Sequence, residues 1–227
     1  MSIENLPMLE HLRISFQRHR IQMSNRLSAV DRGVSELETE IIQRYCERFQ
    51  TLEDEVAGDI KAAVVDHEMW PFFLRVKGIG PGLAGCLLAH IDIEKAPTVS
   101  ALWKYAGLAV NAEGKADKPT KGEKLPYNAE LKRICFLIST SFLRANSPYR
   151  CEYDEAKERY QRAHVDWTLG HCDFAARRKM MKLFLSHLWE AWRIQRGLPV
   201  RQHYAAQVLN HDGDKPMERY LQPVGRR

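Results

Sequence analysis

Apolar residues recur at helical spacing along most of this 227-residue chain, and the first 60 residues show the most regular pattern. Between residues 27 and 41 the apolar positions alternate at steps of three and four, which is the spacing of a coiled-coil seam. Beyond residue 41 steps of four dominate, as in a straight helix packed on a globular body. The positions are Leu27, Val30, Val34, Leu37, Ile41, Tyr45, Phe49, Leu52, Val56 and Ile60. The pattern predicts a long N-terminal coiled-coil-like helix.

A helix with so narrow an apolar stripe needs a partner helix, because a polar helix is only marginally stable alone in water. The partner could be the same region of a second copy, which would make residues 6–60 a homodimer interface. It could equally be part of the same chain, if the region bends into a hairpin near Gly33 or Gly58. The pattern alone does not choose between these two arrangements.

The rest of the chain is also predicted to be helical. We expect helices at 100–107, 128–144, 149–165 and 173–196, with a short element at 204–209. Ser147-Pro148 separates two of these helices, and Gly197 followed by Pro199 ends the last long one in the usual order. The fold class is therefore all-α, with a helical dimerisation region at 1–66 and a helical domain at 67–227.

A glycine-rich stretch at residues 76–82, called the glycine bend below, is the most informative motif. Gly78 and Gly80 flank Ile79, and Pro81 follows directly. Glycine can take φ > 0 and bring bare backbone close to a partner, and proline suits the first residue of a helix. Free amides at the positive end of a helix dipole favour a phosphate. We therefore predict a helix-hairpin-helix motif, a clamp for the nucleic-acid backbone, in which the amides of Gly78, Ile79, Gly80 and Gly82 bind phosphate; an ordinary turn between packed helices is the alternative.

Basic residues supply further candidate phosphate contacts. Lys77 lies in the glycine bend, and a loop predicted at 111–124 carries Lys115, Lys118, Lys121 and Lys124. Arg177 and Arg178 lie on the last long helix and predict a second basic face. Solvated lysines and the polar side of an amphipathic helix are the simpler interpretations of these residues.

Composition narrows the class of protein. A formal net charge of +5 favours polyanionic partners. The five cysteines are scattered and form no Cys-x-x-Cys pair, which indicates free thiols in a reducing compartment and no zinc site. No apolar run reaches the about 20 residues that cross a bilayer, and the N-terminus has no signal-peptide pattern. We expect a cytoplasmic protein with no membrane contact, no metal and no cofactor.

The order of motifs resembles the C-terminal half of the bridge-RNA-guided insertion-sequence transposases, which combine a DEDD nuclease domain with a serine nucleophile. The resemblance covers roughly residues 60–150. It rests on the stretch 76–81, Ile91-Asp92, the segment 102–108 (Leu-Trp-Lys-Tyr-Ala-Gly-Leu), the glycine- and lysine-bearing loop, and Leu131-Lys132-Arg133. It implies a role in DNA recombination by a mobile element, and it makes structured RNA a second candidate partner.

Two parts of that family's chemistry are not found in this sequence. The chain opens in the coiled-coil region, where the family has a resolvase-like domain with four acidic metal ligands before it. The loop that carries the family's serine reads Ala109-Val110-Asn111-Ala112-Glu113-Gly114-Lys115, without a serine. No catalytic residue is predicted, and the sequence favours a binding protein over an enzyme.

The sequence thus predicts a dimeric DNA-binding protein that contacts the backbone without reading bases. Three alternatives remain open. The chain could be a recombinase that works with a nuclease subunit, an RNA-binding scaffold, or a degenerate transposon remnant that folds but does little.

Overall fold

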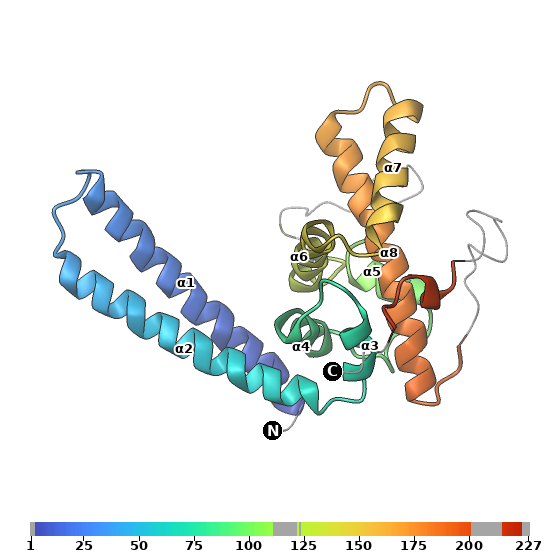
Figure 1. Ribbon diagram of the computed structural model, residues 1–227, viewed down its shortest axis with the longest axis horizontal. Helices are drawn as coiled ribbons and strands as arrows, with labels where there is room; N and C mark the ends of the chain where they lie inside the picture. The colour runs from blue at the N-terminus through green and yellow to red at the C-terminus, as the bar shows by residue number, and fades with distance from the viewer. Residues whose placement is uncertain (1–2, 111–121, 123, 201–214, 224–227) are drawn as a thin grey trace.

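The computed structural model describes residues 3–110, 122, 124–200 and 215–223, and every regular element in these ranges is helical (Figure 1). The elements are η1 (Ile3–Asn5), α1 (Leu6–Asp31), α2 (Thr39–Val65), α3 (Trp70–Arg75), α4 (Pro81–His90), α5 (Val99–Tyr105), α6 (Ala129–Ala145), α7 (Arg150–Ala163), α8 (Leu169–Gln195) and η2 (Met217–Arg219). The predicted all-α class is confirmed. Helices α1 and α2 form an arm that extends from the body, and α7 with the start of α8 forms a second projecting hairpin.

The N-terminal region differs from the continuous helix expected there, because the chain turns back between α1 and α2. Gly33 takes a left-handed φ of +69°, and its amide donates to the carbonyl of Val30 at 2.8 Å. The two helices then pack along each other as an intramolecular hairpin, which is one of the two arrangements the apolar pattern allowed. On α2, the inner face of the arm buries Ile42, Val56 and Ile60 within residues 39–60.

Side-chain caps explain why several helix boundaries agree with the sequence. The side chains of Thr98 and Asn128 accept hydrogen bonds from amides in the first turns of α5 and α6. Helix α8 begins at residue 169, four residues before the expected start, because Thr168 caps it by accepting from the amide of His171 at 3.1 Å. Gly170 lies in that first turn and does not break the helix. The short element expected at 204–209 lies outside the described residues.

Helix α4 lies at the centre of the packing, in contact with α1, α2 and α6. Ala84 and Leu87 are fully buried. A Cβ at Gly85 would lie 2.5 Å from Cγ2 of Ile60, so this glycine lets α2 approach the α4 backbone directly. The position of the arm is therefore set at α4.

Helix α8 fixes the loop that follows α4. The indole of Trp189 donates to the carbonyl of Ala96 at 2.7 Å. The buried Arg193 donates to the same carbonyl and to that of Ile93, each at 3.2 Å. These bonds satisfy backbone groups that burial would otherwise leave unpaired.

The segment 215–223 packs against α3 and α7 and is bonded to both. The hydroxyl of Tyr220 donates to the buried carboxylate of Glu152 at 2.6 Å, and the Lys215 ammonium lies 2.5 Å from the same group. The amide of Gln222 donates to the carbonyl of Arg75 at 2.8 Å. The last residues of α3, just before the glycine bend, are thus held by a distant part of the chain.

A buried carboxylate anchors the arm on α4. Glu10 of α1 is 3% exposed and accepts a hydrogen bond from Sγ of Cys86 at 3.0 Å. Nη2 of Arg13 lies 3.6 Å from the carboxylate, and His90 and Arg133 lie 3.9 Å away. Burial acts to raise the pKa of Glu10, but the hydrogen bonds from His90 and Cys86 and the charge of Arg13 outweigh it and lower this pKa to about 2.

We expect Glu10→Gln to lower the free energy of unfolding at pH 7 by about 3 kcal/mol, the equivalent of the pKa depression. The folded pKa lies below the unfolded value of 4.5, so the stabilisation is complete above that value and disappears as the pH falls towards 2. Urea unfolding at pH 7 and pH 3 should show a much smaller difference between variant and parent at pH 3. Glu158, which forms an exposed ion pair with Arg162 on α7, is the control. Glu158→Gln should lower the free energy of unfolding by less than about 1 kcal/mol at either pH. Equal stability of parent and Glu10→Gln at pH 7 would contradict the anchor.

Candidate nucleic-acid interface

The glycine bend joins two helices, as the sequence predicted, although the first of them, α3, has only six residues. The amide of Ile79 donates to the carbonyl of Val76 at 3.2 Å and closes the bend. Gly80 is extended, with φ −100° and ψ 177°, and Pro81 is the first residue of α4. The amide of Ala84 donates to the carbonyl of Gly80 at 3.0 Å, the first hydrogen bond of that helix.

Gly78 fixes the bend against α6. It has a left-handed φ of +100°, and a Cβ there would lie 3.2 Å from Phe142 and 3.3 Å from Ala145. Its carbonyl accepts a hydrogen bond from the hydroxyl of Ser141 at 2.6 Å. Both the backbone angle and the close packing therefore require glycine at this position.

Ile79 anchors the bend from within and is 8% exposed. Its amide already donates to Val76, so it is not free for a phosphate. This corrects the expectation that the Ile79 amide is part of the clamp. Its side chain fixes the bend in the core, which is a supporting role.

The predicted amide of Gly78 has no hydrogen-bond partner among the described residues and stays a prediction. At the start of α4, the amides of Gly80, Gly82 and Leu83 are candidate donors. The first amides of any α-helix have no partner within that helix, and no hydrogen bond between described residues uses these three. Gly80 and Gly82 are exposed, and a Cβ at either position would meet nothing within 4 Å. Lys77 is exposed beside them. A phosphate could therefore reach bare backbone at the positive end of α4 and be neutralised by a nearby cation.

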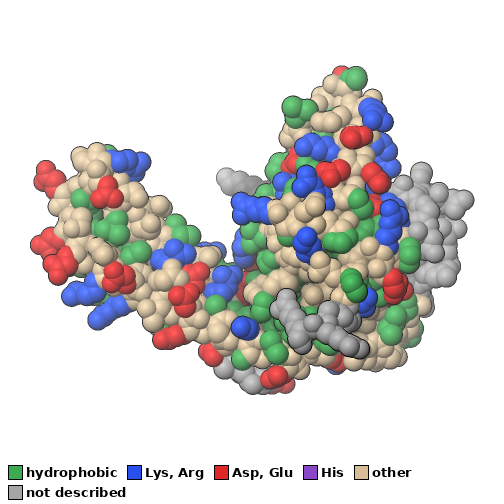
Figure 2. All heavy atoms as spheres, viewed as in Figure 1, with side chains coloured by type: hydrophobic (Ala, Val, Ile, Leu, Met, Phe, Trp, Pro, Cys, Tyr) green, Lys and Arg blue, Asp and Glu red, His purple; other side chains and the backbone are tan. Residues whose placement is uncertain are grey.

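The structure describes only some of the other basic residues that were predicted to contact phosphate. Lys115, Lys118 and Lys121 lie outside the described residues, and Lys124 is exposed. Arg178 is half-buried on α8. Figure 2 shows a hollow between the arm and the body, with both basic and acidic side chains around it.

Arg177 has a packing role that the sequence did not indicate. It donates to Asp173 at 2.8 Å, and to the hydroxyls of Ser139 and Thr140 at 3.1 Å each. Its guanidinium also lies over the ring of Phe136, with Cζ 5.3 Å from the ring centroid. The side chain thus joins α6 to α8, and a phosphate would compete with these partners for its N–H groups.

An exposed pair of aromatic rings was missed by the sequence analysis. Phe136 on α6 and Phe174 on α8 are 45% and 56% exposed, and their ring centroids are 6.0 Å apart. The spacing of the α6 core residues could have identified Phe136, because it falls outside the buried set Leu131, Ile134, Cys135, Ile138 and Phe142.

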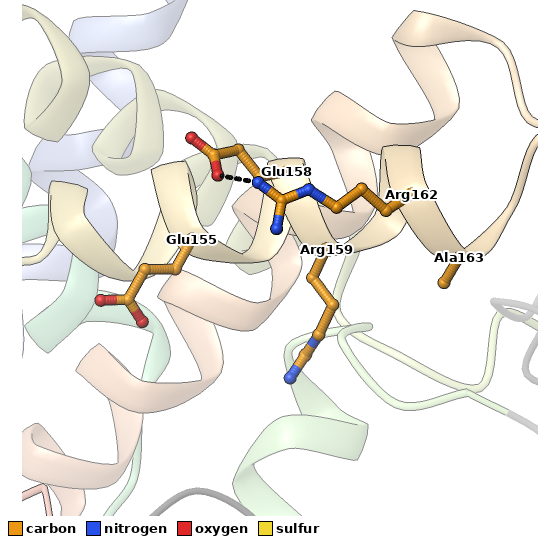
Figure 3. A pocket seen from close by; sticks show the side chains of 5 residues that line it. All are labelled: Glu155, Glu158, Arg159, Arg162 and Ala163. Atoms are coloured by element: carbon orange, nitrogen blue, oxygen red, sulfur yellow. Dashed lines mark hydrogen bonds and ion pairs between the residues drawn. The ribbon is translucent and has the colours of Figure 1, made fainter.

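A surface hollow on α7 offers little for binding. Its lining consists of Glu155, Glu158, Arg159, Arg162 and Ala163, all from one helix (Figure 3). Glu158 and Arg162 form an ion pair at 3.0 Å. Since the lining mixes both charges and all of it comes from one helix, we assign this hollow no role.

The described ranges contain no group of three or more His, Cys, Asp or Glu residues that could hold a metal ion. None of the helices in the described part of the chain has the length and apolar character to cross a membrane. Comparison with protein-family models, with curated proteins and with solved structures finds no match to this chain.

The two glycines of the bend should differ in their effect on stability. We expect Gly78→Ala to lower the free energy of unfolding by about 1–3 kcal/mol, because its left-handed φ is strained for alanine and the new methyl group meets Phe142. Gly80→Ala should change stability by less than about 1 kcal/mol, since its backbone angles suit alanine and the space is open, while alanine is a poorer N-cap than glycine. Thermal and urea unfolding measure both. A greater loss for Gly80→Ala than for Gly78→Ala would overturn this division.

Proposed function

We propose that this chain is a DNA-binding protein that holds backbone phosphates at the start of α4, without sequence preference. The observation that carries the proposal is the pair of exposed glycines, Gly80 and Gly82, beside unpartnered amides of a helix N-terminus. Phosphate contacts of this kind position a protein on a duplex but do not read its bases. The net charge of +5 supports a polyanionic partner.

We further propose that the chain is related to the C-terminal half of the guide-RNA-dependent transposases. The packing of α4 on α6 supports this relation, because it brings two of the motif-bearing segments, 76–81 and 131–133, into one unit. Most of the loop 109–115, where the family has its serine, lies outside the described residues, and it contains no serine in this sequence. Binding of DNA during recombination, rather than strand cleavage, is the role this proposal assigns.

A second copy of the chain is proposed as a partner of the arm. Helix α2 and the residues just before it carry an outward apolar stripe in addition to the buried inner face: Leu37, Ile41, Tyr45 and Leu52 are 52%, 44%, 42% and 37% exposed. This spacing places them along one side of the helix, where a second arm could cover them. A dimer would also present two glycine bends to the same DNA and so strengthen binding through avidity.

The phosphate clamp predicts a strong effect of Gly80→Asp on DNA binding. The added carboxylate would occupy the space in front of the α4 amides and repel the phosphate, so we expect affinity for a short duplex to fall by roughly tenfold or more. Fluorescence anisotropy with duplexes of unrelated sequence should show the same loss for each one. Increasing salt should weaken the parent more steeply than the variant, because the parent neutralises more phosphate charge.

Gly58→Asp is the matched control for this substitution. Gly58 is exposed on α2, a Cβ there meets nothing within 4 Å, and the change in charge is the same. Equal loss of affinity in the two variants would show that net charge, and not the glycine bend, determines binding. Undiminished binding by a folded Gly80→Asp protein would refute the clamp.

The proposed dimer predicts a mass of twice 26.3 kDa in solution. Tyr45→Glu should convert the dimer to a monomer, because it places a charge in the centre of the outward stripe. Light scattering coupled to size exclusion measures the mass. Val165→Glu, at a position that is 87% exposed between α7 and α8, is the control and should leave the dimer intact. A parent protein that is monomeric at all accessible concentrations contradicts the arrangement.

A further inference from the structure

Arg178 and Lys182 on α8 are two neighbouring cations, called the cation pair below. Four residues separate them, so their side chains lie on the same face of the helix, one turn apart. Both residues are half-buried. Helix α5 packs against α8 here, and Trp103 of α5 donates its indole N–H to the backbone carbonyl of Lys182 at 3.0 Å. The cation pair therefore lies beside the contact between α5 and α8.

No carboxylate neutralises the cation pair within the described part of the chain. The side chains of Arg178 and Lys182 make no hydrogen bond and no ion pair with a described residue. Between residues 169 and 189, α8 has one acidic residue, Asp173, and this carboxylate is bonded to Arg177. Like charges four residues apart on a helix repel each other. The two cations thus repel each other and lack an anion from the protein.

The ring of Trp103 offsets only part of the charge of Lys182. Nζ lies 4.9 Å from the ring centroid, which is a cation–π contact. An ammonium group has three N–H donors, and a ring face is a weaker acceptor for them than an oxygen atom. Burial and the charge of Arg178 lower the pKa of Lys182 below its ordinary value. The surroundings therefore disfavour the charged ammonium, and a bound anion would remove that deficit.

The other arginines within α8 have acceptors from the protein. Arg177 is bonded to Asp173 and to two hydroxyl groups of α6. Arg193 donates to the carbonyl of Ala96 and to two further backbone carbonyls. Both side chains thus join elements of the fold, which is a structural role. Arg178 joins nothing in the described structure, so its five N–H donors are left for water or for a ligand.

We propose that Arg178 and Lys182 bind a phosphate group that carries two negative charges. The guanidinium can donate two parallel hydrogen bonds to phosphate oxygens, and the ammonium supplies the second positive charge. A terminal phosphate carries close to two negative charges near pH 7, whereas a phosphate within a strand carries one. The site shares no residue with the glycine bend and goes beyond the proposed function.

Inorganic phosphate and the terminal phosphate of a nucleic-acid strand both have this chemistry. The second source rests on the proposed function, because the glycine bend would then hold the same nucleic acid. The first source does not depend on it.

Acetylation of the full-length protein by acetic anhydride at pH 8, with peptide mass spectrometry, tests the site. Only a neutral amine reacts, so bound phosphate should slow the reaction of Lys182 by roughly tenfold, because it stabilises the charged form and covers the amine. The probe is inorganic phosphate, compared with chloride at equal ionic strength. Lys61, exposed on α2, is the internal control and should react equally in both salts.

Arg178→Gln removes one of the two cations. Without phosphate, this substitution should slow the acetylation of Lys182, because loss of the repulsion raises the pKa of that amine. Phosphate should then give Lys182 little further protection. Arg162→Gln makes the same change in charge at an exposed position on α7 and should behave as the parent does. Circular dichroism and thermal unfolding check that each variant folds.

Two duplexes of one sequence, with and without 5′-terminal phosphates, distinguish the sources. Protection of Lys182 by inorganic phosphate, with no difference between the duplexes, assigns a free phosphate ion. Stronger protection by the phosphorylated duplex assigns a strand end. Failure of the clamp has a different signature, since Gly80→Asp would then leave duplex affinity unchanged while inorganic phosphate still protects Lys182.

Three results would overturn the phosphate site. The first is unchanged acetylation of Lys182 in inorganic phosphate and with both duplexes. The second is equal protection by the two duplexes with none from inorganic phosphate, which indicates that bound DNA merely covers the amine. The third is protection by phosphate in Arg178→Gln as strong as in the parent.

Discussion

The contact between Gly78 and α6 is the constraint on which the proposed interface depends. The left-handed backbone at Gly78 turns the chain from α3 into α4, and the hydroxyl of Ser141 holds its carbonyl at 2.6 Å. A side chain at this position would meet Phe142 and Ala145, so the bend could not approach α6 as closely. Because α6 fixes one end of the bend, the amides at the other end, in the first turn of α4, have a defined direction towards solvent.

Three glycines in this region meet three different requirements. Gly78 supplies a backbone angle and a close contact, and Gly85 allows α2 to lie against α4. Gly80 has ordinary backbone angles and open space, and it is the N-cap residue of α4, a position that glycine suits better than alanine. Close approach of a ligand to its backbone is a further physical reason for glycine there. This difference is what links the local structure to the proposed binding of phosphate.

The sequence predicted those parts of the structure that local signals determine. The starts of α5 and α6 follow from the caps Thr98 and Asn128, and the start of α4 follows from Pro81. Whether the N-terminal region forms a hairpin depended on the packing of α1 and α2 on α4, which no local signal reveals. The face of α2 was only partly predicted: Val56 and Ile60 point inward, but Ile41 and Tyr45 are exposed. A straight helix rotates relative to a heptad pattern, so the apolar spacing alone did not identify which of these positions face the core.

The candidate site was predicted in outline and not in its hydrogen bonds. The glycines and Pro81 identify the bend because few residues suit such positions. The pairing of the Ile79 amide and the network around Arg177 depend on neighbours that are far apart in sequence or set by the exact turn. The exposure of Phe174 likewise depends on how α8 packs against α6. A helical period alone cannot distinguish a core phenylalanine from an exposed one at the edge of the apolar face.

The two ends of α4 carry opposite electrostatic requirements, and this asymmetry fits the two purposes of the helix: holding the arm and, in the function we propose, binding phosphate. Glu10 contacts Cys86 and His90 in the C-terminal half of α4, where the helix dipole is unfavourable for a carboxylate. The positive charges of Arg13 and Arg133 offset this unfavourable interaction of the Glu10 carboxylate with the helix dipole. The ion pair with Arg133 also joins the arm to the body. At the N-terminal end the dipole is positive, and no acidic side chain is bonded to the free amides in the described structure. In the proposed function the external phosphate is therefore attracted to the N-terminal end of α4, while the C-terminal end holds the arm in place.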